Sequence, residues 1–218
     1  MKKISIILSV SLFVIQICFA QALPSLQTGW ERIYINNVGS FDLPPTMEIQ
    51  KGKYKESVDE IRKIKGLDAS QVTAQPKGTN DFDKEGLEKY ARVMLETIFG
   101  SVGDFEKLNF NIAEYSQADI NELSSIFRQQ TEQSFRGTGL KLIEWYLPKF
   151  EKVNGVSCFH FSYKRQLKDK PFVLVHVYAF PNNDRMHTFA LSYRLSEADY
   201  WKSDFAIILK SFRITNIR

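Results

Sequence analysis

Four runs of residues in the C-terminal half are rich in apolar, β-branched and aromatic residues, and each run has the length of a strand. They cover residues 140–151, 156–166, 172–180 and 186–195. Short connections join them, and the first is Asn154-Gly155, a sequence typical of two-residue hairpins. Because connections this short make neighbouring strands run in opposite directions, the pattern predicts an antiparallel meander of four strands.

The third run, residues 172–180, is apolar on both of its faces. A strand of this kind is covered on both sides, so the pattern predicts layers of helix or loop above and below the sheet. Residues 116–136 have helical spacing and begin with Ser116 and Asp119, which suit an N-cap pair. Ser196 is expected to cap a final helix. The predicted class is α+β, a mainly antiparallel sheet sandwiched between helices.

The N-terminal half predicts shorter elements. A hairpin is predicted for residues 30–35 and 38–43. The charged segment 55–65 is predicted to be a helix with a thin apolar stripe, and residues 71–75 are predicted to be a short strand. Residues 87–99 match the period of a helix and that of one strand face equally well. We favour the strand for this segment, partly because of the resemblance described below.

The first twenty residues have the layout of a secretory signal peptide. Lys2 and Lys3 precede an apolar run, and Cys18-Phe19-Ala20 offers small residues before a cleavage site. The run is short for a membrane anchor, and the residues before Cys18 lack the small residue of a lipoprotein signal. We therefore expect a signal peptide at 1–20, a leader at 21–29 and one α+β domain at 30–218. The protein is expected to be exported, to the periplasm or out of the cell, and to have no transmembrane span after the signal peptide is removed.

Charge and cysteine content narrow the class of protein. The net charge of +4 falls to +2 when Lys2 and Lys3 are removed, and this small excess argues against a nucleic-acid partner. The mature chain keeps one cysteine, Cys158, and so has no internal disulfide. An exported chain of this kind depends on its hydrophobic core for stability.

Taken in order, these elements resemble the PsbP-like fold, named for an extrinsic photosystem subunit. Its relatives include Ran-binding nuclear proteins and many exported bacterial proteins of unknown role. The resemblance implies an α/β/α arrangement and a role as a binding or assembly module. The resemblance lies in the order and pattern of the elements and covers most of residues 30–213. It rests on five features of the sequence: the opening hairpin with Phe41-Asp42-Leu43-Pro44-Pro45, the strand at 71–78, Tyr90-Ala91-Arg92-Val93, the meander, and the closing helix with residues 207–212.

The sequence offers little material for catalysis or for a cofactor. Cys158 and His160 share a strand face and make a weak candidate for a thiol nucleophile, but a buried cysteine is the better interpretation. His160, His176 and His187 lie on three successive predicted strands, where certain registers bring histidines together for a metal. Histidines satisfied by their neighbours are the favoured interpretation, and we expect no cofactor.

A group of basic residues surrounds the tip of the second predicted hairpin of the meander, and we treat it as a possible partner contact. The group consists of Lys164, Arg165, Lys168 and Lys170. An acidic partner or an anionic headgroup would fit it, although a solvated loop kept polar for solubility is the favoured interpretation.

Three hypotheses for function follow. The first is a non-enzymatic binding or assembly module of the bacterial envelope, acting on an unknown protein or small ligand. The second is an enzyme whose site is assembled from distant residues such as Cys158, the histidines or Glu144. The third is a carrier of lipid or another small ligand, which requires an internal cavity.

Overall fold

The computed structural model describes residues 25–52, 55, 56, 60, 69–106, 115–215 and 217. The predicted signal peptide and residues 21–24 of the predicted leader lie outside these residues. The predicted helix at 55–65 lies outside them too, except for three of its positions.

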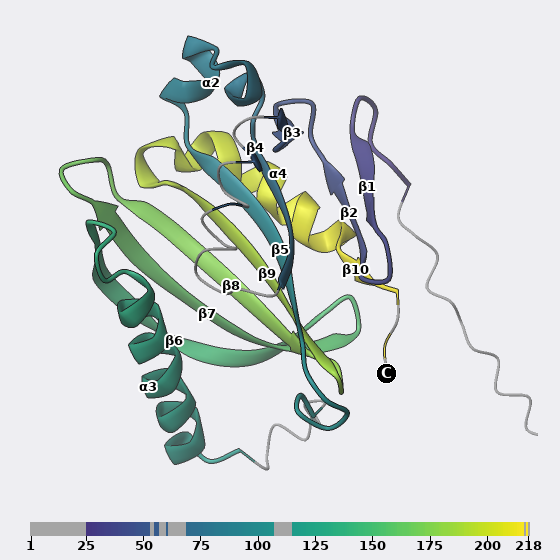
Figure 1. The fold of residues 1–218 in the computed structure, drawn as a ribbon, viewed down its shortest axis with the longest axis vertical. Coiled ribbons are helices and arrows are strands. Elements are labelled where there is room, and N and C mark those ends of the chain that lie inside the picture. The colour runs from purple at the N-terminus through teal and green to yellow at the C-terminus, as the bar shows by residue number, and fades with distance from the viewer. Residues whose placement is uncertain are drawn as a thin grey trace, which may run out of the picture.

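Seven strands form one antiparallel sheet in the order β3-β4-β5-β9-β8-β7-β6 (Figure 1). The four-strand meander is confirmed as one side of this sheet: β6 is Leu140–Val153, β7 Val156–Leu167, β8 Val173–Pro181 and β9 Arg185–Arg194. The predicted sheet had too few strands, however, because β9 also pairs along its length with β5 (Ala91–Phe99). Two further strands extend the sheet, β4 (Ala69–Pro76) and β3 (Met47–Ile49).

The ambiguous segment 87–99 is a strand for most of its length, as favoured above. The short helix α2, Lys84–Glu88, ends just before β5 begins. The apolar residues at 87 and 90 that matched a helix therefore belong to α2 and the connection after it. The alternating burial of β5 follows from pairing, since Ala91, Val93 and Leu95 all lie on the same face and are buried.

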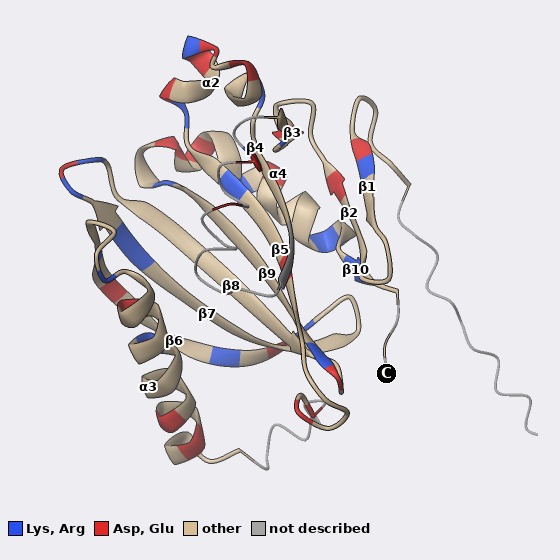
Figure 2. Cartoon of the chain, in the orientation of Figure 1, with Lys and Arg blue, Asp and Glu red and all other residues tan. Residues whose placement is uncertain are grey.

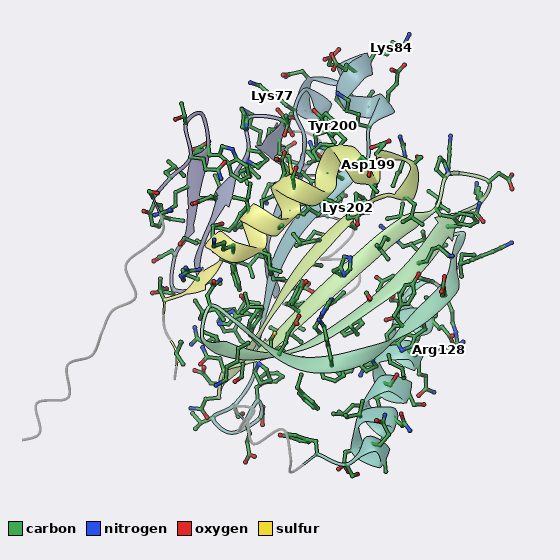
Figure 3. All side chains as sticks on the ribbon, turned by 180° about the vertical axis from the view of Figure 1, so that it is seen from behind. Lys77, Lys84, Arg128, Asp199, Tyr200 and Lys202 are labelled. Carbon is green, nitrogen blue, oxygen red and sulfur yellow. The ribbon has the colours of Figure 1, made fainter. Side chains whose placement is uncertain are left out.

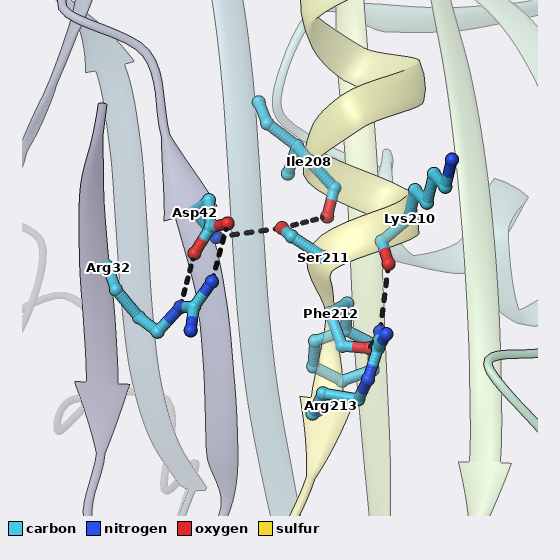
Figure 4. Close-up of polar contacts among 7 residues, drawn as sticks. All are labelled: Arg32, Asp42, Ile208, Lys210, Ser211, Phe212 and Arg213. Carbon is cyan, nitrogen blue, oxygen red and sulfur yellow. Dashed lines mark hydrogen bonds and ion pairs between the residues drawn. The ribbon is translucent and has the colours of Figure 1, made fainter. Parts of the chain in front are cut away.

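The predicted N-terminal hairpin is present but belongs to a second, three-stranded sheet. It pairs β1 (Glu31–Ile35) with β2 (Gly39–Leu43), and β2 pairs in turn with β10 (Arg213–Ile214) near the end of the chain. Asp42 ties this small sheet to the C-terminal helix (Figure 4). Its carboxylate accepts hydrogen bonds of 2.6 and 3.0 Å from Arg32, and its backbone N–H donates to Ser211 Oγ at 2.8 Å.

Two packed cores lie on opposite faces of the large sheet. On one face, α3 (Gln117–Ser134) places Phe127 against Phe159 and Phe161, with ring centroids 4.9 and 5.0 Å apart. On the other face, α4 (Ala198–Ser211) buries Trp201, Phe205 and Ile208. Alternating residues of β8 contribute to both cores, as expected for a strand covered on both sides.

The helices cover less of the sheet than the predicted sandwich requires. Helix α3 lies along β6, whereas α4 lies against β9 and β2, so helix and small sheet together cover the part of the second face at β9 (Figure 1). Among the described residues, no helix has both the length and the apolar character needed to span a bilayer.

Capping distinguishes the two long helices. Helix α3 has the expected capping box, in which Ser116 Oγ accepts from the Asp119 N–H at 3.2 Å and the Asp119 carboxylate accepts from the Ser116 N–H at 2.8 Å. The prediction for α4 was wrong, because Ser196 lies inside the 3-10 turn η3 (Leu195–Glu197) and Glu197 is the N-cap residue. The Glu197 carboxylate accepts hydrogen bonds from the Trp201 indole and the Tyr90 N–H instead, because it lies between β5 and α4.

Candidate functional site

A row of polar side chains lines one face of β6, β7 and β8, the face on the α4 side of the sheet. Directly paired residues of antiparallel strands point to the same face, and the registers Lys149↔His160, His160↔Tyr178 and Ser162↔His176 define this one. Figure 3 shows α4 crossing the sheet to one side, away from β6–β8. We call this surface the polar face; it consists of Glu144, Tyr146, Lys149, Glu151, Cys158, His160, Ser162, Lys164, His176 and Tyr178.

Two of the three histidines meet on the polar face. His160 Nε2 lies 3.3 Å from His176 Nδ1, and the His160 ring stacks on Tyr178 with centroids 4.2 Å apart. On the other side of the ring, His160 Nδ1 lies 2.8 Å from Glu151 Oε1, although the N–H direction is not aligned for a hydrogen bond. Burial lowers the pKa of His160 to about 4 and lowers the pKa of His176, so both rings are neutral at pH 7.

The third histidine lies on the same face of the sheet but in the core. His187 pairs with Phe180 across β8 and β9 and is fully buried. Its Nδ1 lies 2.9 Å from Thr97 Oγ1, and its Nε2 lies 3.4 Å from the Asn182 side-chain amide. Within the described part of the chain, no group of three or more His, Cys, Asp or Glu residues is placed to hold a metal ion.

Cys158 is completely buried at the edge of this face. Burial, reinforced by the charge of Glu151, raises the pKa of the thiol to about 12. The thiol donates weakly to the Glu151 carbonyl oxygen at 3.4 Å. A thiol with this pKa is protonated at neutral pH and is a poor nucleophile, which favours the structural interpretation of Cys158 and His160.

The four basic residues of the predicted partner contact do not form one patch. Lys164 lies on the polar face, where its Nζ is 2.6 Å from Glu144 Oε2. Arg165 points to the opposite face and donates to the Tyr90 hydroxyl at 2.6 Å. Lys168 and Lys170 are exposed at the turn between β7 and β8. Lys164 and Arg165 are adjacent on one strand and therefore point to opposite faces, which the grouping by sequence proximity did not take into account.

A surface cleft of about 400 Å³ lies beside a projecting segment that sequence reasoning did not single out. The segment, here called the 78–89 lobe, contains η1 (Thr79–Asp81) and α2 (Figure 1). Figure 3 shows Lys77 and Tyr200 near the base of the lobe beside α4, and Lys84 at the far end of the lobe. The cleft is lined by Pro45, Thr46, Pro76, Lys77, Gly78, Asp83, Glu85, Gly86, Lys89 and Tyr200. Charged residues of both signs mark the lobe in Figure 2, whereas β8 and β9 carry few.

The lobe also exposes two apolar side chains, neither of which is among the residues that line the cleft. Phe82 is 61% exposed and Leu87 is 49% exposed. Phe82 has a φ of 58°, in the left-handed region that a bulky residue rarely adopts. Its N–H donates to the Thr79 carbonyl, and the next N–H, of Asp83, donates to the Gly78 carbonyl at 2.9 Å. In the sequence the only sign of this feature is a lone phenylalanine between two aspartates.

The neighbouring wall of the cleft is formed by α4 and the end of α2. Tyr200 is 46% exposed, and Lys89 Nζ lies 4.9 Å from the centre of its ring. Glu85 holds the same ammonium at 3.0 Å, and this hydrogen bond raises the pKa of Lys89. The result is an aromatic surface bordered by charged groups and open to solvent.

Comparisons with known proteins support the architecture alone. No protein-family model matches the chain, and no curated protein matches it. The solution structure of cyanobacterial PsbP (CyanoP) from Synechocystis sp. PCC 6803 is similar with a TM-score of 0.50 at 14% identity, covering 87% of this chain and 94% of that one. A crystal structure from Bacteroides thetaiotaomicron VPI-5482 aligns over 82% of this chain and 45% of that one, at 7% identity and a TM-score of 0.41. The chain has a PsbP-like fold.

Proposed function

We propose that the protein is an exported binding module that docks a partner protein through the 78–89 lobe and the adjoining cleft. The observation that carries the proposal is Phe82. A large apolar side chain that is mostly exposed, on a backbone conformation unfavourable for it, is better explained by contact with a partner than by its contribution to folding.

The composition of the surface fits a protein partner. Phe82 and Leu87 on the lobe would supply apolar contacts, and Tyr200 in the cleft would supply an aromatic contact bordered by Lys77, Lys89 and Glu85. Aromatic anchors within a polar rim are the usual arrangement of protein–protein interfaces. The role of a binding or assembly module that the PsbP-like resemblance implies agrees with this, as an analogy of fold.

The shape of the clefts favours this hypothesis over a lipid carrier. The cleft at the lobe is open and borders charged residues, and a second cleft of about 440 Å³ beside β1 and β3 also includes Glu31, Glu48, Lys51 and Lys77. An apolar ligand instead favours an enclosed apolar pocket. On both faces of the sheet, the interior next to β8 is occupied by packed aromatic rings.

Site-specific photocrosslinking in the source cells tests the proposal. A photoreactive phenylalanine analogue is placed at position 82 or 200, and at position 34 as a matched control, since Tyr34 is 70% exposed on β1. We expect the same discrete adduct from positions 82 and 200, none from position 34, and recovery in the envelope or secreted fraction with a mature N-terminus at Gln21. Absence of an adduct at position 82, or an identical adduct at position 34, would contradict the docking surface.

A further inference from the structure

The strongest unassigned feature is the histidine pair on the polar face. His160 and His176 come from neighbouring strands at diagonal positions, so the register of β7 and β8 fixes their separation. Their facing nitrogens, His160 Nε2 and His176 Nδ1, are 3.3 Å apart. His160 is nearly buried and His176 half-buried, which keeps the rings in place while leaving one side of the pair towards solvent.

The distance between the two nitrogens can be compared with the distance between neighbouring ligand atoms in metal sites of known geometry. Zinc–imidazole bonds of about 2.0–2.1 Å at a tetrahedral angle place the two nitrogens about 3.3 Å apart. A square-planar Cu²⁺ site would need about 2.8 Å between adjacent nitrogens at similar bond lengths. The observed separation therefore matches two adjacent corners of a tetrahedron.

The neighbours of His160 suit the role of a ligand. A metal-bound histidine usually directs its second ring nitrogen to a carboxylate or carbonyl, which fixes the tautomer. Here Nδ1 lies 2.8 Å from Glu151 Oε1, although its N–H is not aligned for a hydrogen bond, and the other oxygen of the same carboxylate lies 2.8 Å from Lys149 Nζ. With its proton on Nδ1 beside Glu151, His160 presents the lone pair of Nε2 to His176.

We infer that His160 and His176 form a two-nitrogen site for a tetrahedral divalent metal ion of the zinc type, with two positions left open for water or an external ligand. This goes beyond the sequence-based expectation, which left the histidines satisfied by their neighbours. Binding requires neutral His176 to carry its proton on Nε2, so that the lone pairs of His176 Nδ1 and His160 Nε2 both face the ion. The site is independent of the lobe, and its failure would leave the proposed function untouched.

The chain makes the test simple, because it contains only three histidines. Protein purified without a histidine tag is titrated with Zn²⁺ against a fluorescent chelator, and with Co²⁺ to record the visible spectrum. We expect one ion per chain with a tetrahedral Co²⁺ spectrum. Imidazole NMR signals of His160 and His176 should shift with Zn²⁺, whereas those of His187 should not.

Variants assign the ligands. His176→Ala and His160→Gln should lose the site, and Glu151→Gln should weaken it about 10–100-fold through the lost carboxylate. Cys158→Ala is the matched control and should bind as the parent does, since its protonated thiol lies outside the pair. If the parent binds no Zn²⁺, or if His176→Ala binds as tightly as the parent, the inference is wrong. The NMR measurement on the parent decides the matter if a variant does not fold.

Discussion

Acidification should destabilise the fold through His187, and the structure gives the size of the effect. His187 is fully buried on β9, between Thr97 on β5 and Asn182 in the turn before β9. Burial, with a smaller contribution from the positive charge of Arg185, lowers the pKa of the imidazole to about 4; the charge of Asp184 opposes this. The folded protein therefore keeps this ring neutral at a pH where an unfolded chain protonates it.

The sign and magnitude follow from linkage. Above the unfolded pKa of 6.5 the ring is neutral in both states and adds no pH dependence. As the pH falls below 6.5, the unfolded chain takes up a proton that the folded chain excludes, so stability decreases until the folded pKa is reached. Between pH 7 and pH 5 a shift of this size removes about 2 kcal/mol from the free energy of unfolding.

Urea unfolding followed by tryptophan fluorescence at pH 7, 6 and 5 measures this loss. His187→Gln is the comparison, because glutamine offers hydrogen-bonding groups to Thr97 and Asn182 but does not titrate. His160 and His176 also have lowered pKa values, and their contribution is common to both proteins, so the difference between the two pH profiles isolates His187. Parallel profiles would refute the reasoning, as would an NMR titration that finds an ordinary pKa for His187.

Two further substitutions test how the sheets are held together. Gly39→Ala places a Cβ 2.0 Å from the Arg213 carbonyl oxygen, so β10 must move away from β2. The free energy of unfolding in urea should fall by about 1–3 kcal/mol. The amide hydrogen of Thr215, which donates to the Val38 carbonyl, should exchange with solvent faster. Glu197→Ala leaves the buried Trp201 indole without its acceptor and should cost about 1–3 kcal/mol in the same assay, while Glu197→Gln should recover part of it. An unchanged midpoint in either alanine variant would contradict the contact it removes.

The local elements were largely predictable because period and turn chemistry are local properties. The four meander strands, the capping box at Ser116 and the hairpin through Asn36 and Asn37 all follow from neighbouring residues. The pairing of β5 with β9 joins segments about a hundred residues apart, and periodicity contains no information on such partners. For the same reason periodicity could not show that the N-terminal hairpin pairs with residues 213–214.

The candidate sites were predictable only in part, and strand register explains the difference. The sequence placed His160, His176 and His187 on successive strands, but a shift of one residue would have reversed the face of any of them. The observed register puts Ser162 opposite His176, which brings His160 and His176 together and leaves His187 opposite Phe180 in the core. The same alternation separates Lys164 from Arg165, two residues that looked like one patch.

The 78–89 lobe could not be found from periodicity because its conformation depends on close backbone contacts. Gly86 lies so near the Lys77 carbonyl and the Thr79 N–H that a Cβ would come within 2.7 and 2.8 Å of them. Thr79 adds hydrogen bonds from its hydroxyl to the carbonyls of Pro76 and Gly86, at 2.7 and 3.3 Å. These contacts hold the turn in which Phe82 has its left-handed backbone, at a cost of about 1–2 kcal/mol for a residue with a Cβ. The turn therefore places the Phe82 backbone before any partner binds, so that little backbone entropy is lost when a partner covers its side chain.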